Sequence, residues 1–404
     1  MNVAGTTRRS RKTGNVDLVI ETLRSDGPSS QAALSRRTEL APATINNIVQ
    51  ALRADGVVEL RRVNGREALV ELTAGRSAIV SIRVGASSVE AAWLDFAAET
   101  RFDAALPGSG GPEAVIALIR ALGGEAARRP VSAIALGVEA PIDRATGAIA
   151  PWAAARLPGW REVDIRAILE RAFEVPVIAD NDANFDALAE WTWGAGRGAD
   201  CFLNVTCSEG IGSGLIIDGR VHRGGDGMAG QIGHMVVEQG GAVCFCGNRG
   251  CLATVVSERA IVQSLRGSDS ERETLREIVA AAEAGDAACQ RVLFESGRYL
   301  GRALANAAKI IAPKVVCVGG LLGNAKPFVL DGLNSSIEVT THRAISPSIE
   351  FTTSELGPDA RLTGGVAAAL LAIGQGVSEL APWMIARTAT RPPPLAAPEP
   401  AARA

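Results

Sequence analysis

The sequence contains no run of about 18 apolar residues, the length a membrane-spanning helix needs, so we predict that no segment crosses a membrane. No secretory signal opens the chain, and we therefore expect a cytoplasmic protein in a reducing compartment, where metal binding by cysteine outranks disulfide formation. Hydrophobic residues make up 47% of the 404 residues and charged residues only 21%, which is typical of a globular protein with a sizeable core. This length predicts two or three domains.

The net charge of the chain is small, but the charged residues are unevenly distributed along it. The formal net charge is −3, yet residues 1–66 carry eleven Arg and Lys against six Asp and Glu, a net of +5, which leaves −8 on the remaining 338 residues. A basic amino-terminal segment on an acidic body indicates a nucleic-acid contact at one end only. A solvated basic tail is the alternative, because Arg8, Arg9, Arg11 and Lys12 precede any periodic structure.

The most informative segment supplies one imidazole and three thiols within eighteen residues: His234, Cys244, Cys246 and Cys251. This ligand set is typical of a closed tetrahedral zinc site. Because it leaves no position open for water, we predict a structural Zn²⁺ that holds a loop in place.

Four glycines in the same stretch let the backbone turn tightly around one ion: Gly240, Gly241, Gly247 and Gly250. The alternatives are a glycine-rich turn with incidental cysteines, or a disulfide between two of them. The other four cysteines lie in segments that we expect to be buried, where free cysteine acts as a small hydrophobe: Cys201, Cys207, Cys289 and Cys317.

The first 75 residues have the order of a winged helix-turn-helix. Apolar residues from Val16 to Leu23 fall at helical spacing, and Ser29 or Ser30 is a natural N-cap for a second helix, Gln31–Arg37. Pro42 is placed in the first turn of a third helix that runs to Asp55. Residues 57–60 and 69–72 then read as two strands of a basic wing. We predict a DNA-binding domain over residues 1–75, including the basic tail.

The outer face of the third helix is polar, which suits base reading by Asn and Gln and phosphate contacts by small hydroxyl groups, while wing arginines suit phosphate or minor-groove contacts. A helical protein-interaction module of the same shape is the alternative. The candidate contacts to double-stranded DNA are Ser30, Gln31, Thr44, Asn46, Asn47, Gln50, Arg53, Arg62 and Arg66.

Residues 76–384 alternate strand and helix patterns, which predicts an α/β body. The first series has strands near 78–82, 89–94 and 132–137, helices over 112–128 and 163–173, a strand over 175–179 and a helix over 183–193. A second series runs from Cys201 to about Leu371, with a long helix near Ala287–Ile311 and a buried strand over Lys314–Val318. Residues 385–404 are rich in Pro and Ala and are expected to be a disordered tail.

Three motifs in this body carry possible chemistry. Asn181-Asp182-Ala183-Asn184 follows an expected strand, where Asp182 could accept a proton from a substrate hydroxyl or the residues could cap a helix. The stretch from Gly210 to Gly214 could present backbone N–H groups to phosphate or form a hairpin turn. Gly319-Gly320 could pass under a nucleotide or simply turn the chain.

Together these motifs resemble the ROK family, which groups sugar kinases with sugar-responsive bacterial repressors. The resemblance runs from about Val16 to Gly374 and includes GVEAPID (137–143), LPGW (157–160), NDAN (181–184), GQIGH (230–234) and the zinc loop. It implies an actin-like (ribonuclease H-like) pair of α/β lobes with a sugar and nucleotide cleft between them. The appended winged helix places the chain with the repressor branch.

Departures from the family pattern affect the cleft. Kinase members have an Asp-x-Gly-Gly-Thr phosphate loop, and the equivalent stretch here begins with Arg83, which would set a positive charge against Mg²⁺. The family's sugar-binding Asn falls at Arg156, one of its Glu residues at Gln231 and another at Ala253, while Asn181, Asp182 and His234 are retained. By resemblance, His234 can join the zinc to the sugar, one ring nitrogen on each.

The altered cleft leaves two interpretations of Arg156 open. If it points inward, it favours an anionic ligand such as a sugar acid or sugar phosphate. If it is solvated, the cleft is vestigial. The candidate ligand-binding residues are Asn181, Asp182, Gln231, His234 and Arg156.

We therefore expect a DNA-binding transcriptional regulator, a repressor without catalytic activity, that senses a small carbohydrate-like ligand and forms a homodimer or a dimer of dimers. The alternative is an ATP-dependent sugar kinase with an accessory DNA-binding domain and Asp182 as its base. A regulator that responds to a partner protein is a third hypothesis.

Overall fold

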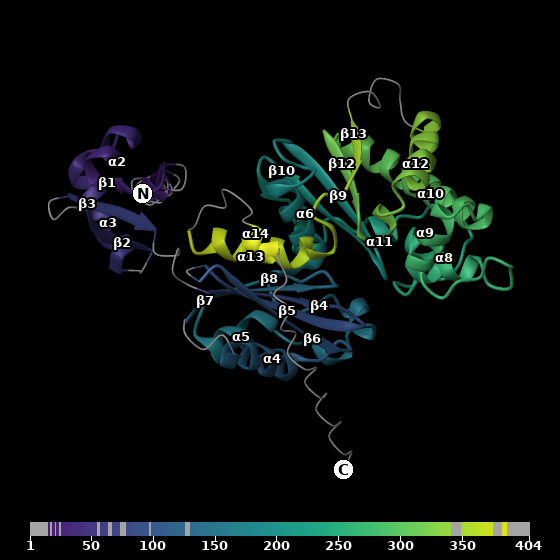
Figure 1. Ribbon diagram of the computed structural model, residues 1–404, viewed down its shortest axis with the longest axis horizontal. Coiled ribbons are helices and arrows are strands. Elements are labelled where there is room, and N and C mark those ends of the chain that lie inside the picture. The colour runs from purple at the N-terminus through teal and green to yellow at the C-terminus, as the bar shows by residue number, and fades with distance from the viewer. Residues whose placement is uncertain are drawn as a thin grey trace, which may run out of the picture.

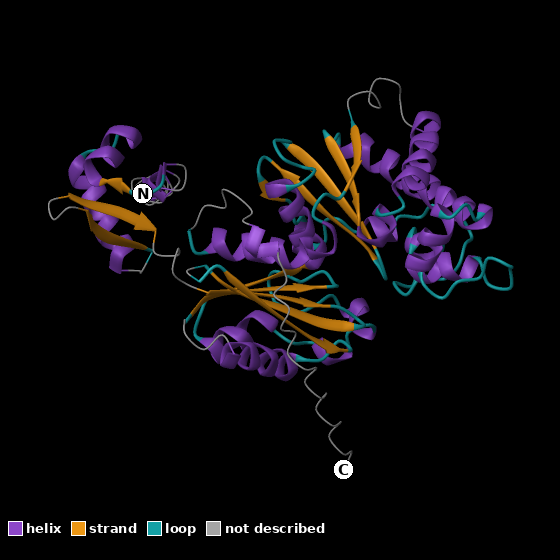
Figure 2. Ribbon diagram, in the orientation of Figure 1, coloured by secondary structure: helices purple, strands orange, loops and turns teal. Residues whose placement is uncertain are grey.

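The computed structural model describes residues 15–16, 18–20, 22–23, 26–54, 57–63, 67–72, 78–96, 98–125, 130–340, 349–374 and 382–385. An amino-terminal unit lies beside a body of two lobes, each with its own sheet (Figures 1 and 2). The expected basic tail before residue 15 and the expected disordered tail after Ile385 lie outside the described residues.

The amino-terminal unit has the helices and wing that the sequence predicts. Its elements are β1 (Ser29–Ser30), α2 (Gln31–Thr38), α3 (Pro42–Ala54), β2 (Val58–Val63) and β3 (Glu67–Leu72). Ser30 is the N-cap of α2, since its side chain accepts a hydrogen bond from the Ala33 N–H, and Pro42 is the first residue of α3. The sheet order is β1-β3-β2, and residues between 15 and 23 that are described are helical. Apolar residues of all three helices form one core with Val58 and Val70.

The first lobe contains β4 (Ala78–Val84), β5 (Ser88–Asp95), β6 (Thr100–Pro107), α4 (Pro112–Glu125), β7 (Val131–Val138), the 3₁₀ helices η2 (Pro151–Ala155) and η3 (Pro158–Trp160), α5 (Ile165–Phe173), β8 (Val177–Asn181) and α6 (Asp182–Trp193). Its sheet order is β6-β5-β4-β7-β8. Helix α5 begins two residues later than expected because Asp164 caps it, accepting a hydrogen bond from the Ala167 N–H at 3.0 Å.

The second lobe contains β9 (Cys201–Cys207), β10 (Ile211–Ile217), β11 (Arg220–Val221), η4 (Gly225–Gly227), η5 (Ile232–His234), α7 (Ala253–Val256), α8 (Glu258–Ser264), α9 (Leu275–Glu283), α10 (Ala287–Ile311), β12 (Val315–Gly319), α11 (Gly320–Gly323), α12 (Lys326–Thr340), β13 (Glu350–Thr353), η7 (Gly357–Asp359) and α13 (Ala360–Ala372). Its sheet order, β11-β10-β9-β12-β13, repeats the pattern of the first lobe, with the first three strands antiparallel and the last two parallel to their neighbours.

Two helices between the sheets are exchanged between the lobes. Helix α6 follows the last strand of the first lobe but packs on β9 and β10, whereas α13 follows the last strand of the second lobe and packs on β4 and β7 (Figure 1). The two helices also pack on each other so closely that a Cβ on Gly364 would lie 1.7 Å from the carbonyl oxygen of Phe185. This crossing joins the two lobes and brings the amino-terminal ends of both helices together between them, where Arg361 contacts Asp182.

The described chain ends at Ile385, the first residue of the expected tail. A short helix, α14 (Pro382–Ile385), buries Met384, whose carbonyl oxygen accepts a hydrogen bond from Arg101 Nη1 at 2.8 Å. Met384, the last residue of the expected body, is thus packed within the fold, while Ile385 is 38% exposed.

Candidate functional site

Two cavities lie in the cleft between the lobes, one of about 550 Å³ and one of about 60 Å³. Arg83, Thr206, Ser208 and Arg361 line both. All five residues proposed from the sequence as ligand contacts line the smaller cavity: Asn181, Asp182, Gln231, His234 and Arg156. The fold thus collects side chains that are up to 78 positions apart, His234 and Arg156, around one small space.

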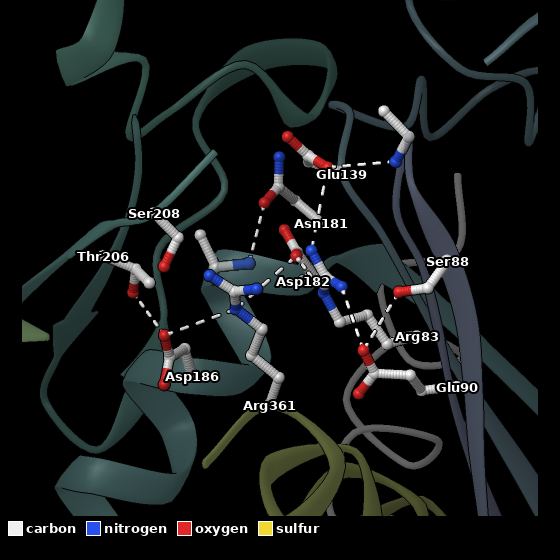
Figure 3. Close-up of polar contacts among 12 residues, drawn as sticks. Arg83, Ser88, Glu90, Glu139, Asn181, Asp182, Asp186, Thr206, Ser208 and Arg361 are labelled. Carbon is white, nitrogen blue, oxygen red and sulfur yellow. Dashed lines mark hydrogen bonds and ion pairs between the residues drawn. The ribbon is translucent and has the colours of Figure 1, made fainter. Parts of the chain in front are cut away.

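Arg83, at the end of β4, reaches into the cleft between three carboxylates from three separate segments (Figure 3). Its Nε lies 3.2 Å from Asp182 Oδ2, and its Nη atoms lie 3.5 Å from Glu90 Oε1 and 3.7 Å from Glu139 Oε2. Only 11% of the Arg83 side chain is exposed. Burial, the largest single influence, lowers the pKa of Arg83, but the three carboxylates together raise it above its ordinary value. The guanidinium therefore stays charged and neutralises this group of acids.

Arg361, in the first turn of α13, contacts the same region from the other side (Figure 3). Its Nε lies 3.6 Å from Asp182 Oδ2 and 3.7 Å from Asp186 Oδ2. Burial raises the pKa of Asp186 to about 6, although Arg361 and the hydrogen bond from the Thr206 hydroxyl both lower it. Asp182 is thus paired with two arginines of the chain, Arg83 and Arg361.

Asn181 caps a helix, which is one of the two roles considered for it in the sequence. Its Oδ1 accepts a hydrogen bond from the Ala183 N–H at 2.9 Å and so caps α6. This bond orients the amide, and the Nδ2 atom is left on the opposite side without a hydrogen-bond acceptor among the described residues (Figure 3). The cap therefore positions a free donor at the cavity.

Arg156 points into the cleft, but its charge is already paired. Its Nη2 lies 3.0 Å from Glu139 Oε1, and its guanidinium lies over the Phe245 ring, 5.2 Å from the ring centroid. The side chain is 28% exposed, so it is not fully solvated. Its ion pair with Glu139 also means that it is not an unpaired cation in the cleft.

The two glycine motifs differ in structure. Most of the Gly210–Gly214 stretch belongs to β10, after a hairpin turn closed by the Ser208 N–H and the Gly210 carbonyl, so the hairpin alternative is the correct one. Gly214 is required because a Cβ there would lie 2.5 Å from the Ala183 carbonyl oxygen on α6. Gly320 turns the chain with φ +75° and lines the larger cavity.

The four proposed zinc ligands come together beside the smaller cavity, with all ligand atoms within 4.8 Å of one another. Cys246 Sγ lies 3.8 Å from Cys251 Sγ, and His234 Nδ1 lies 3.5 Å from Cys244 Sγ. An ideal tetrahedral site with Zn–S bonds of about 2.3 Å has sulfur atoms about 3.8 Å apart, so these residues fit Zn²⁺. The loop depends on Gly250 (φ +68°), where a Cβ would lie 1.7 Å from the Glu238 carbonyl oxygen.

His234 presents its two ring nitrogens to different surroundings. Nδ1 faces Cys244, while Nε2 has no hydrogen-bond partner in the described part of the chain, and the residue lines the smaller cavity. Burial, and secondarily the charge of Arg156, lowers the pKa of His234, which favours the neutral imidazole that a metal needs.

The residues proposed to contact DNA lie on the amino-terminal unit. Asn46, Asn47, Gln50 and Arg53 are exposed on α3, while Thr44 and Gln31 are half-buried at the starts of their helices. Ser30 caps α2, Arg62 lies in β2, and Arg66 falls outside the described residues.

Several cleft residues were missed in the sequence, notably Glu139, Asp186 and Arg361. A signal for Asp186 was present, because Asp182, Asp186 and Glu190 recur every fourth residue along α6 and share one buried face. Arg361 had no comparable local signal, since its partners lie about 180 positions away.

Family models match both the amino-terminal unit and the body of the chain. The ROK family profile matches residues 79–373, and a winged helix-turn-helix DNA-binding profile matches residues 18–59. The first match covers most of the chain, and the protein belongs to the ROK family. Among the described residues, no helix is long and apolar enough to cross a membrane.

Relatives include both enzymes and regulators. A glucokinase of Halalkalibacterium halodurans is 36% identical over 222 residues, 51% of this chain and 67% of that protein. A xylose repressor of Bacillus subtilis is 32% identical over 205 residues, and there the matched segment spans about half of each protein, 51% and 53%. The transcriptional dual regulator NagC of Escherichia coli is 27% identical over 372 residues, 85% of this chain and 91% of its own length.

A solved structure resembles nearly the whole chain. A ROK family transcriptional regulator, described as a homologue of the E. coli MLC protein, matches with a TM-score of 0.77 and 23% identity, covering 93% of this chain and 98% of its own. It supports the fold of an amino-terminal winged helix joined to an actin-like body.

Proposed function

We propose that this protein is a DNA-binding transcriptional repressor whose body senses a carbohydrate-like ligand and does not transfer phosphate. The observation that carries the proposal is Arg83: a buried guanidinium occupies the centre of the cleft and pairs with Asp182, the residue that a kinase would use as its base. A cation fixed at this point repels Mg²⁺ and pairs with Asp182, Glu90 and Glu139, carboxylates that could otherwise hold it. The full-length similarity to proteins named as regulators supports the same conclusion.

Ligand binding requires the cleft to widen. The smaller cavity, about 60 Å³, is well below the roughly 300 Å³ at the lower end of small-molecule sites. Contacts across the cleft close it, since the Ser87 hydroxyl donates a hydrogen bond to Glu209 Oε1 at 2.5 Å, and Gly210 lies against Glu139 and Arg156. A ligand that binds only the open form would shift the lobes toward it.

Helix α13 provides a physical link from the cleft to the DNA-binding unit. It begins beside Arg361 in the cleft, and two residues beyond its end a Cβ on Gly374 would lie 3.5 Å from Val57 Cγ1 and 3.7 Å from Ile20 Cδ1. Movement of this helix would change the position of the winged helix. In a homodimer or dimer of dimers, that displacement would alter the spacing of two recognition helices on a palindromic operator.

The DNA contacts can be tested by fluorescence anisotropy with a duplex selected by the protein and with random DNA. Asn47→Ala and Gln50→Ala should weaken binding to the selected duplex more than to random DNA, because base contacts specify sequence. Arg62→Ala and Arg66→Ala should weaken both and reduce the salt dependence. Equal losses on both DNAs for all four variants would exclude base reading by α3.

The absence of catalysis is tested with ATP and a panel of hexoses, amino sugars and sugar acids. We expect no sustained ADP formation. Asp182→Asn should alter ligand-induced release from DNA and leave DNA binding without ligand near normal. ATP turnover with any sugar, lost in Asp182→Asn, would instead establish the kinase.

A further inference from the structure

Asp180, in β8 of the first lobe, binds donors from both lobes. Its Oδ1 accepts hydrogen bonds from the Asn181 N–H at 2.8 Å and from Asn184 Nδ2 at 2.7 Å. Its Oδ2 accepts one from Arg223 Nε at 2.7 Å and lies 2.6 Å from Arg223 Nη2. Asp180 is only 6% exposed, and a carboxylate offers about four acceptor sites, which these contacts occupy. Its role is therefore to order neighbouring groups rather than to bind a ligand.

The Asp180–Arg223 pair lies outside both cavities of the cleft, since neither residue lines either of them. On the side of the first lobe, the carboxylate fixes the turn from β8 into α6 at which Asn181 and Asp182 reach the smaller cavity. Asn184, which donates to the same carboxylate, is 5% exposed in the first turn of α6. The direction in which Asn181 and Asp182 point therefore depends on Asp180.

On the side of the second lobe, Arg223 begins the loop that leads to further residues of the smaller cavity. It follows β11 by two residues, and its carbonyl oxygen accepts a hydrogen bond from the Ala229 N–H at 3.0 Å, which closes the loop. Gln231 and His234, which line the smaller cavity, come soon after this loop. The Arg223 guanidinium thus ties this segment of the second lobe to the turn that Asp180 orders.

The ion pair is well suited to hold the two lobes in a fixed relation. Two nitrogen atoms of the Arg223 guanidinium contact the same carboxylate oxygen, and hydrogen bonds between charged groups are stronger than those between neutral ones. Because the Asp180 side chain is nearly buried, removal of the guanidinium would leave a charge without its cation inside the fold, which is unfavourable. Loss of Arg223 is therefore expected to displace the groups around Asp180.

We propose that Asp180 and Arg223 are positioning residues of the ligand site, whose ion pair sets the first-lobe residues of the smaller cavity against its second-lobe residues. Ligand affinity then depends on two residues that do not line the cavity. Side chains that bind a ligand need their own orientation fixed by neighbouring hydrogen bonds, and this pair supplies them to both halves of the site. The inference rests on the ligand sensing proposed above and adds the contact that holds the two halves together.

Calorimetric titration of the zinc-loaded, full-length protein tests the pair. The probes are D-glucose, D-xylose, N-acetylglucosamine and glucose 6-phosphate, and the one that binds the wild type most tightly is used for the variants. Arg223→Met should weaken its binding about tenfold, the lower end of what loss of a supporting hydrogen bond costs at metal and catalytic sites. Arg223→Lys keeps the charge and should recover part of the affinity. Because both residues act through one contact, adding Asp180→Asn to Arg223→Met should cost no further affinity.

Three measurements separate positioning from a general loss of structure, all made at a temperature where every variant is folded. Arg220→Met is the matched control and should bind sugar as the wild type does, since Arg220 is exposed in β11 and has no ion pair among the described residues. Zinc content should be unchanged in every variant. Binding of Arg223→Met to a duplex selected by the protein, without sugar, should equal that of the wild type, because the candidate DNA contacts lie on the amino-terminal unit.

The possible outcomes distinguish this inference from the proposed function. Wild-type sugar affinity in Arg223→Met overturns the inference and leaves ligand sensing intact. Equal losses of sugar binding and DNA binding in that variant mean general damage and overturn the inference as well. If the wild type binds none of the four probes, ligand sensing fails, and the positioning role fails with it.

Discussion

Two polar clusters flank the smaller cavity, and they are assembled in opposite ways. The zinc-ligand cluster takes His234, Cys244, Cys246 and Cys251 from one segment of eighteen residues. The arginine–carboxylate cluster takes Arg83, Glu90, Glu139, Asp182, Asp186 and Arg361 from both lobes and from both exchanged helices. The first offers four ligand atoms that could hold a metal ion, while the second carries its cations within the chain. A local loop can offer all its ligands to one metal ion, whereas a cleft between lobes can be neutralised by side chains from distant segments.

Removing a zinc ligand should have the largest effect. Cys246→Ser is expected to abolish binding of about one zinc per chain and to unfold the loop, because structural zinc contributes on the order of 10 kcal/mol in small zinc sites. Metal content by mass spectrometry and thermal unfolding measure this. The matched control is Cys201→Ser, a half-buried cysteine outside the cluster, which should keep its zinc. A stable and active protein without metal would disprove the structural role.

Removing the Arg83 guanidinium should have the next largest effect on stability. Arg83→Met leaves Glu90, Glu139 and Asp182 facing one another, and breaking a buried ion pair in this way costs about 3–5 kcal/mol. Without the guanidinium, these carboxylates resemble a site for a hard cation. Mg²⁺ or Ca²⁺ should therefore partly restore the unfolding temperature of this variant and leave the unfolding temperature of the wild type unchanged.

The control for Arg83→Met is Arg223→Met, which removes an arginine paired with a single carboxylate, Asp180, at 2.6 Å. That variant should be destabilised without rescue by divalent cations. If Arg83→Met is also insensitive to them, the three carboxylates do not form one cluster.

The smallest of the three effects concerns pH. The pKa of Asp186 is raised from 3.8 to about 6 in the folded protein, so the folded state binds the proton more tightly than the unfolded state. This contribution to stability is complete below about pH 4 and is lost as the pH rises through about 6. Relative to Asp186→Asn, the wild type should lose about 3 kcal/mol between pH 4 and pH 7.

Urea unfolding of both proteins at intervals between pH 4 and pH 7 measures this difference, with Glu113→Gln on the exposed face of α4 as the control. A constant difference between the wild type and Asp186→Asn across this range would contradict the raised pKa.

Most of the helices and strands could be predicted, with errors where a short-range side-chain contact decided a boundary. The helix expected near Ala287–Ile311 spans those residues, and the structure adds its cap, Asp286, which accepts hydrogen bonds from the Ala288 and Cys289 N–H groups. The start of α5 was placed too early because the cap at Asp164 was not identified. Helix α14 was missed because four residues carry no period, and its burial depends on β6, which lies far away in sequence.

The sequence by itself determined the four candidate metal ligands, the winged helix-turn-helix and the repeated α/β pattern, because each depends on residues within a few turns of one another. It also located Arg83, but not what Arg83 does. Only the tertiary structure decided that Arg83 and Arg361 both contact Asp182, that Glu139 neutralises Arg156, and that Phe245 and Trp152 share one wall of the cavity. These contacts exist because α6 and α13 cross between two sheets, an arrangement set by the packing of the whole body.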